Sequence, residues 1–311
     1  MRHFDFDAEV AFGGYRWWYL DALSADGLHG LTLIAFVGSV FSPFYASARQ
    51  RGATDPMQHC AINVALYGQS GKRWSMTERG RGAVTRSADR LVIGPSSLQW
   101  DGTALDIQVN EITVPIPSRL RGRIRVVPNR PTHRPYALDA AGRHRWNPIA
   151  PVAHVELDFE RPGLRWTGAG YLDSNGGDEP LEDAFTGWNW ARATVDSGTL
   201  VIYDVERRGD GPLSLAVHID RAGNATPVDV PPAVPLASTR WRIARAMRSE
   251  SADPPRIAQT LEDTPFYARS LIEAQLLGQP VAAFHESLSL DRFRSAWVRR
   301  LLPFRMARSR G

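Results

Sequence analysis

Short apolar runs recur along the whole chain, and turn-forming residues separate them. Within the runs apolar and polar side chains tend to alternate, which is typical of strands, and Gly, Pro, Asp or Ser lie between them. The expected strands are residues 15–22, 30–41, 60–67, 72–78, 104–109, 111–115, 152–159, 164–171, 198–206, 213–219, 239–247 and 282–290. Helical spacing occurs in residues 265–277, and a hairpin turn is expected at 208–211. The pattern predicts an all-β chain of antiparallel barrels or sandwiches with little helix.

The length of 311 residues suits one large domain or two of about 150 residues each. A Pro-rich passage at 128–135 and a charged turn at 140–145 mark the expected joint. We therefore expect two β-domains packed side by side, at residues 1–140 and 141–311. A second irregular passage at 227–235 is expected to be a long loop within the second half.

Composition excludes several classes of protein. Lys and Arg total 37 against 33 Asp and Glu, an excess too small and too dispersed to predict nucleic-acid binding. Cys60 is the only cysteine, so no disulfide framework is possible, and the spacing of a zinc site is missing. Residues 1–7 include the acids Asp5 and Asp7, where a signal peptide has its basic and apolar regions. These features predict a cytoplasmic location.

Two segments raise the question of membrane contact. Residues 30–48 carry no charge, but Gly38 and Pro43 interrupt them, so we expect a buried strand followed by a turn. The C-terminal segment interleaves arginines with Phe293, Trp297 and other apolar residues, and it could rest on an anionic membrane surface. The alternative is a segment that closes the domain and ends in a frayed basic tail. The arginines are Arg292, Arg294, Arg299, Arg300, Arg305, Arg308 and Arg310.

Two short constellations could carry chemistry. Tyr171 and Asp173 lie two residues apart in a strand-like run, and so do His144 and Trp146, so each pair shares one face. A carboxyl against aromatic surface is poorly solvated, which raises its pKa and favours the protonated form. If the two strands are neighbours, the set could protonate an alkene, shield the carbocation and activate water. The alternative is structural: a histidine beside Arg and Pro is usually a loop or surface residue, and a tryptophan such as Trp146 is more often part of the core.

The triplet Tyr-Leu-Asp occurs at 19–21 and again at 171–173. The repeat agrees with two similar β-domains, and it makes Asp21 a rival of Asp173. Other acids that remain possible are Glu78, Asp183 and Glu286. The acidic turn at 173–183 could be taken for a calcium loop, but it departs from EF-hand spacing and lacks the flanking helices.

Several blocks, in order along most of the chain, resemble the carotenoid 1,2-hydratase family, also called hydroxyneurosporene synthases. The blocks are residues 13–19, 35–43, 76–80, 144–151, 170–185, 260–270 and 285–293. The resemblance implies two lipocalin-like β-domains, no cofactor, and addition of water to the terminal C1=C2 double bond of acyclic carotenoids such as neurosporene and lycopene. A His-x-Trp pair and a Tyr-x-Asp pair are essential in that family, and they fall on His144, Trp146, Tyr171 and Asp173.

The resemblance and the residue types together suggest a mechanism. Asp173 would protonate C2, Trp146 and Tyr171 would shield the tertiary cation at C1, and His144 would orient or deprotonate the attacking water. No metal is expected. An apolar substrate needs an aromatic channel and contact with a membrane, which we expect to be peripheral. The candidates for the lining are Trp17, Trp18, Trp188 and Trp190.

Two other functions remain open. A non-catalytic lipocalin-like carrier of an apolar ligand would use the same aromatic side chains and would tolerate Asn at position 173. A polyene cyclase would use the same acid, exclude water and yield an isomer.

Overall fold

The computed structural model describes residues 4–52, 54–68 and 71–309, so the expectations for residues 1–3 and for Arg310 lie outside the described part of the chain. Most of the described chain is β-strand, and its sheets are antiparallel apart from one short strand, which confirms the all-β prediction. The chain divides into two compact units. The first unit comprises Met1–Ala137, Ala141–Pro180 and Arg300–Gly311, and the second comprises Leu138–Ala140 and Leu181–Arg299.

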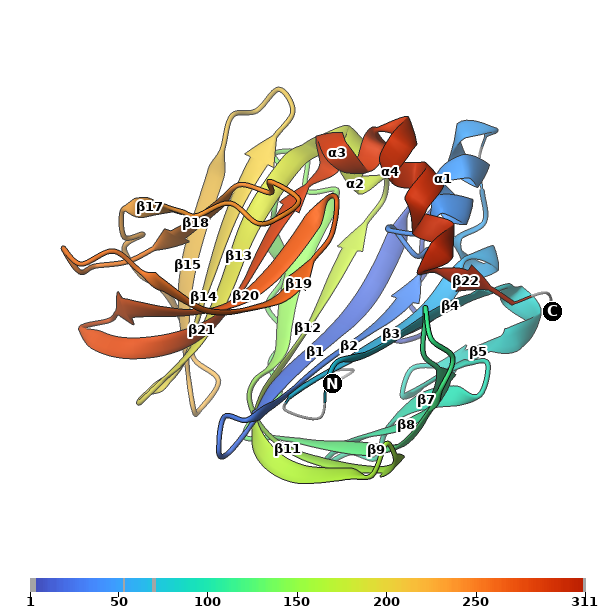
Figure 1. Ribbon diagram of the computed structural model, residues 1–311, viewed down its shortest axis with the longest axis horizontal. Helices are drawn as coiled ribbons and strands as arrows, with labels where there is room; N and C mark the ends of the chain where they lie inside the picture. Colours follow the sequence, from blue (N-terminus) through green and yellow to red (C-terminus); the bar gives the residue numbers. More distant parts are fainter. Residues whose placement is uncertain (1–3, 53, 69–70, 310–311) are drawn as a thin grey trace. The chain divides into compact units, whose positions relative to one another are not determined.

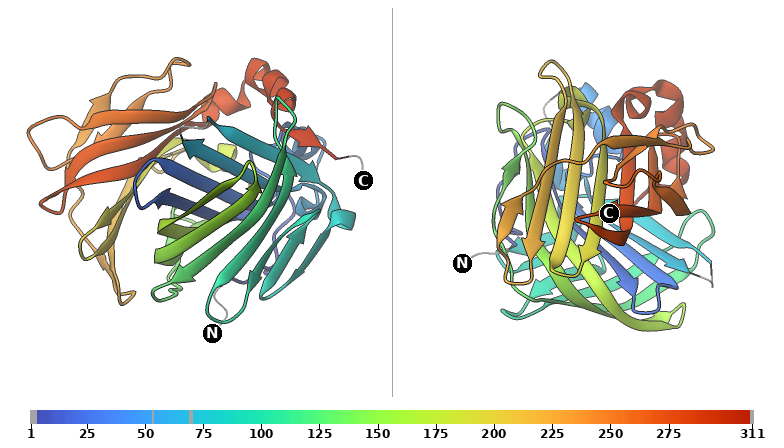
Figure 2. Two further views of the ribbon diagram at one scale, coloured as in Figure 1. Left: turned by 60° about the horizontal axis from the view of Figure 1, so that its bottom comes forward. Right: turned by 90° about the vertical axis from the view of Figure 1, so that its left-hand side faces the viewer.

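The first unit is a large sheet curled into a half-barrel (Figure 1; Figure 2, left). Its strand order is β22-β4-β3-β2-β1-β12-β11-β9-β8-β7-β6-β5, and β10 pairs with β11. The strands are β1 (Tyr15–Ser24), β2 (His29–Val37), β3 (Cys60–Gly68), β4 (Arg73–Arg79), β5 (Val84–Ser87), β6 (Arg90–Ile93), β7 (Ser96–Trp100), β8 (Leu105–Ile112), β9 (Arg119–Pro128), β10 (Tyr136–Ala137), β11 (His144–Arg161), β12 (Leu164–Gly177) and β22 (Ala307–Arg308). Short helical segments of this unit are α1 (Pro43–Gln50), η1 (Pro56–Gln58) and η2 (Arg81–Ala83).

Apolar side chains fill the inside of this curl. On β1 the side chains alternate, so that Trp18 and Leu20 enter the core cluster. The N-terminal segment contributes Phe4 and Phe6 to the same cluster, and the Trp18 indole donates a hydrogen bond to the Phe4 carbonyl oxygen at 2.8 Å. The interior of the half-barrel is therefore packed as a core, and Tyr19 and Asp21 of β1 lie on the opposite face.

The second unit has a smaller antiparallel sheet in the order β16-β15-β14-β13-β21-β20-β19 and a separate pair, β17 with β18. Its strands are β13 (Phe185–Val195), β14 (Gly198–Arg207), β15 (Leu213–Asp220), β16 (Ala225–Pro227), β17 (Ala233–Leu236), β18 (Arg245–Arg248), β19 (Arg256–Asp263), β20 (Tyr267–Leu276) and β21 (Gln279–Ser289). The remaining helices of the described residues are α2 (Leu181–Ala184), α3 (Leu290–Arg294), α4 (Ala296–Leu301) and η3 (Leu302–Phe304). The expected hairpin at 208–211 joins β14 to β15.

The first unit continues past residue 140, where we expected the domain joint. β11 and β12 hydrogen-bond to each other, and they also pair with β9 and β1 of the first sheet. Because these two strands complete the half-barrel, the chain passes into the second unit at Pro180 and Leu181.

Three local expectations are wrong. Residues 265–277 form the strand β20, because β19 and β21 pair with it on both sides. Residues 104–115 contain one strand, β8, and residues 239–247 are strand only from Arg245. The buried strand β2 is followed by a turn, as expected, and then by the helix α1, where Ser42 accepts hydrogen bonds from the Phe44 and Tyr45 amides. In the part of the chain that the structure describes, no helix is long and apolar enough to cross a membrane.

Candidate functional site

Three neighbouring strands of the first sheet, β11, β12 and β1, build the candidate site. Residues directly opposite each other in an antiparallel pair lie on the same face. Asp173 of β12 lies opposite Pro148 of β11 and Tyr19 of β1. Trp146 lies opposite Asn175, two residues away from the Pro148–Asp173 pair on each strand. The pairing therefore gathers the acid and its aromatic neighbours on the face opposite the apolar core.

Asp173 is held by two donors on one oxygen. The Trp146 Nε1 and the Tyr171 hydroxyl each donate a hydrogen bond to its Oδ2 at 2.8 Å. The Trp146 Nε1 also lies 3.1 Å from the Tyr171 hydroxyl oxygen, and the Asn175 amide donates to Asp173 Oδ1 at 3.4 Å. Asp173 is 2% exposed, while Trp146 and Tyr171 are fully buried. The structure thus brings together three of the four residues that the sequence predicted.

Tyr171 keeps its proton. Burial raises the pKa of the Tyr171 hydroxyl well above its usual value, and the negative charge of Asp173 raises it further. A phenol with so high a pKa acts as a fixed hydrogen-bond donor throughout the working pH range. Tyr136 and Tyr19 pack against the two aromatic side chains of this site, with ring centroids 5.0 Å from Trp146 and 6.4 Å from Tyr171 respectively.

His144 lies on the same face but away from the acid. It is opposite Gly177, four residues along β12 from Asp173, which is about 13 Å at the rise of a strand. Its Nδ1 is 2.9 Å from the Tyr15 hydroxyl, and its Nε2 is 3.4 Å from Glu179 Oε1. His144 is fully buried. Both ring nitrogens therefore have partners near one end of these strands.

The four predicted lining tryptophans lie in different places. Trp17 is opposite Asn175 on the face of the site and stacks on Tyr15, with ring centroids 4.9 Å apart. Trp18 points the other way, into the core of the half-barrel, so the expectation that it lines the site is wrong. Trp188 and Trp190 lie on β13 of the second unit, on the face opposite its core cluster. Their contact with substrate stays a prediction.

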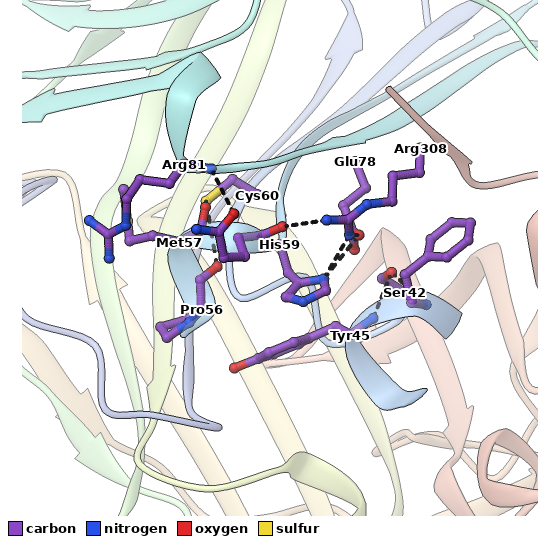
Figure 3. A network of polar contacts seen from close by, with 11 residues as sticks. Ser42, Tyr45, Pro56, Met57, His59, Cys60, Glu78, Arg81 and Arg308 are labelled. Carbon is purple, nitrogen blue, oxygen red and sulfur yellow. Dashed lines mark hydrogen bonds and ion pairs between the residues drawn. The ribbon is translucent and has the colours of Figure 1, made fainter. Parts of the chain in front are cut away.

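Three other acids that the sequence left possible as proton donors each lie near an arginine. Glu78, on β4, contacts His59 and Arg308 in a buried network (Figure 3). Glu286 is paired with Arg269 on neighbouring strands of the second unit. Asp183 is exposed, 3.9 Å from Arg294.

The acidic turn that follows β12 is engaged with arginines. Asp178 forms an ion pair with Arg145 at 2.9 Å, and Glu179 forms one with Arg143 at 2.7 Å. These pairs direct two carboxylates of the supposed calcium loop toward arginine side chains.

Sequence reasoning missed four neighbours of the site, Tyr15, Tyr19, Tyr136 and Asn175. The signal that could have found Asn175 is its spacing, because it continues the face of Tyr171 and Asp173 by two residues. The repeated Tyr-Leu-Asp triplet does not mark two domains, because its two copies lie side by side in β1 and β12 of one sheet.

Comparison with known proteins identifies the family of this chain. A family model described as carotenoid hydratase CrtC matches residues 33–311. The acyclic carotenoid 1,2-hydratase of Thiocapsa roseopersicina is 58% identical over 98% of this chain and 76% of its own length. The enzyme of the same name from Rubrivivax gelatinosus is 52% identical over 97% of this chain and 75% of its own.

Solved structures show the fold alone. A putative AttH from Nitrosomonas europaea superposes with a TM-score of 0.59 at 15% identity, covering 88% of this chain and 92% of that one. Kievitone hydratase from Nectria haematococca superposes with a TM-score of 0.55 at 9% identity, covering 90% of each chain. The fold is therefore AttH-like, and with the sequence matches along most of its length the chain belongs to the CrtC carotenoid hydratase family.

Proposed function

We propose that this protein is an acyclic carotenoid 1,2-hydratase that adds water to a terminal C1=C2 double bond. The observation that carries the proposal is the buried Asp173 carboxyl, which Trp146 and Tyr171 hold by one oxygen within aromatic surroundings. Its relatives named acyclic carotenoid 1,2-hydratase support the same substrate class. Hydration is redox-neutral, so the proposal uses no cofactor.

The hydrogen bonds suggest which oxygen of Asp173 carries the proton. Oδ2 accepts from both Trp146 and Tyr171, and two donors occupy both lone pairs of a carboxyl oxygen. In the neutral acid the proton then lies on Oδ1. Both donors can bind Oδ2 in the neutral acid as well as in the carboxylate. Asp173 can therefore present Oδ1–H to the alkene in a fixed orientation.

Protonation at C2 leaves the positive charge on the tertiary carbon C1, because the more substituted cation is the more stable. The faces of Trp146 and Tyr171 can shield this charge by cation–π attraction, worth about 2 kcal/mol when desolvated. That is a small part of the barrier reduction that enzymes achieve. Most of the catalysis must therefore come from a dry, well-oriented acid.

Replacing Asp173 tests the proposal. We expect purified protein, incubated with lycopene in oxygen-18 water, to yield a labelled tertiary alcohol. The Asp173→Asn variant keeps the shape of the side chain but has no acidic proton, so its rate should fall at least about 100-fold. Product mass spectrometry is the measurement, and the unfolding midpoint checks that the variant is folded. Full activity of Asp173→Asn would exclude this acid, an isomeric product would indicate a cyclase, and unchanged polyene would favour a carrier.

We also propose that the protein lies in the cytoplasm. Because its substrate is almost wholly apolar, we propose that it contacts a membrane peripherally. The second unit carries a suitable surface. Trp241 and Trp297 are 43% and 45% exposed, and their rings stack with centroids 6.1 Å apart. The exposed Arg240 and Arg242 flank Trp241. Tryptophan beside arginine is typical of the membrane–water interface.

A further inference from the structure

A second Tyr–Asp pair lies directly beside the first. In the β1–β12 register Tyr19 is opposite Asp173, and Asp21 is opposite Tyr171. The Tyr19 hydroxyl donates to Asp21 Oδ2 at 3.0 Å, as the Tyr171 hydroxyl donates to Asp173. Asp21 is fully buried. Each carboxyl therefore has the tyrosine of the other pair as its cross-strand neighbour.

The hydration reaction needs a base close to its acid. C1 and C2 are bonded to each other, so the attacking water loses its proton within a few ångströms of the atom that Asp173 protonates. Asp21 and Asp173 occupy diagonal positions of an antiparallel pair, whose Cβ atoms are typically about 7–8 Å apart. Inverting glycosidases leave room for a water with carboxyl groups about 6.5–9.5 Å apart. His144 lies opposite Gly177, four residues along β12 from Asp173, and its ring nitrogens contact Tyr15 and Glu179.

Thr32 supplies an independent sign of a water site. It lies opposite Asp21 on β2, on the same face of the sheet. Its side chain is 2% exposed, and its Oγ1 is buried with no hydrogen-bond partner among the described residues. An unsatisfied buried hydroxyl destabilises the fold, and an ordered water commonly satisfies such a group.

We propose that Asp21 is the general base of the hydration and that Thr32 holds the attacking water; this rests on the proposed hydratase function. Asp173 gives its proton to C2, and the π electrons of C1=C2 form the new C–H bond. A lone pair of water forms the C1–O bond, and the water proton passes to the Asp21 carboxylate. The proton then returns from Asp21 to the Asp173 carboxylate, by way of the hydroxyls of Tyr19 and Tyr171. Both carboxyls end in their starting states.

The two half-reactions can be measured separately for an Asp21→Asn variant. With lycopene in deuterium oxide enriched in oxygen-18, reversible protonation by Asp173 places deuterium at C2 of recovered lycopene, whereas capture of the cation yields labelled alcohol. We expect alcohol formation to fall at least about 100-fold while deuterium still enters recovered lycopene. An equal loss of exchange and hydration would show a structural role, and undiminished hydration would exclude Asp21 as base.

A second variant tests the water site with little risk to folding. Thr32→Val keeps the side-chain shape and removes the hydroxyl, so hydration should fall relative to exchange. Ser75→Ala is the matched control, because Ser75 Oγ is also buried without a partner among the described residues but lies opposite Val64, on the core face. Thr32→Val with unchanged hydration would overturn the water site. An Asp173→Asn variant that still exchanged and hydrated would instead contradict the proposed function.

Discussion

His285 in the second unit makes folding sensitive to acid. It is 1% exposed, its Nε2 lies 2.8 Å from the Ala246 carbonyl oxygen, and burial lowers its pKa from 6.5 to about 4. Below pH 6.5 the unfolded chain binds a proton that the folded protein does not. The resulting loss of stability grows until about pH 4 and approaches about 3 kcal/mol.

A denaturation series at several pH values measures this effect. Between pH 6.5 and pH 4, the free energy of unfolding of His285→Gln should fall less steeply with decreasing pH than that of the wild type. The difference in slope should correspond to about one bound proton. His218→Gln is the control, because His218 is partly exposed in the same unit and bonds to Ser197. Identical slopes for wild type and His285→Gln would contradict the prediction.

At the scale of single residues, sequence periodicity predicted the part of the site that lies on one strand. Tyr171 and Asp173 share a face because strand side chains alternate. The same argument put His144 beside Trp146 but could not give its distance from Asp173, because that depends on the register between β11 and β12. Asp21 was seen as a rival acid, and only the pairing of β1 with β12 makes it a neighbour.

The short strand β22 is held to the sheet by a buried ion pair. It runs parallel to β4, with Arg308 opposite Glu78. The Arg308 guanidinium contacts the Glu78 carboxylate and donates to the Gln58 carbonyl oxygen at 3.2 Å, while His59 lies 3.0 Å from the same carboxylate (Figure 3). Glu78 is 1% exposed. The contacts with these partners therefore replace the interactions with water that the carboxylate has lost.

Removing one member of this pair should destabilise the first unit. Arg308→Met leaves the buried carboxylate undercompensated, and we expect a loss of about 2 kcal/mol, since the arginine is partly exposed. Urea denaturation is the measurement. Arg305→Met is the control, because Arg305 stacks on Trp74 at 4.5 Å, and it should cost less than half as much. A Glu78→Gln/Arg308→Met protein no more stable than Arg308→Met alone would contradict the ion-pair explanation.

At the scale of elements, strands with alternating side chains were predictable, and elements decided by their neighbours were not. Residues 265–277 have a helical spacing, but hydrogen bonds to β19 and β21 stabilise them as a strand. β13 was not predicted. Its side chains are buried on both faces over much of its length, so it lacks the alternation of a half-exposed strand.

At the scale of the whole molecule, composition and periodicity gave the fold class but not the course of the chain. The joint was expected near residue 140, where proline and charge accumulate. Pairing between β1 and β12, which lie about half the chain apart, keeps residues 144–177 in the first unit. Such long-range pairing leaves no local mark in a single sequence, and it is also what assembles the site.

Membrane contact is a property of the whole molecule, and vesicle flotation can measure it. Replacing both Trp241 and Trp297 with Ala removes the exposed aromatic pair, so binding to vesicles of anionic lipid should fall several-fold and the remainder should decrease with salt. The matched control is Phe12→Ala, which removes a 69% exposed aromatic from the first unit. We expect hydration of vesicle-borne lycopene to fall with vesicle binding, while detergent-dispersed lycopene is converted at the wild-type rate. A double variant that still floats with the vesicles would place the membrane-binding surface elsewhere on the chain.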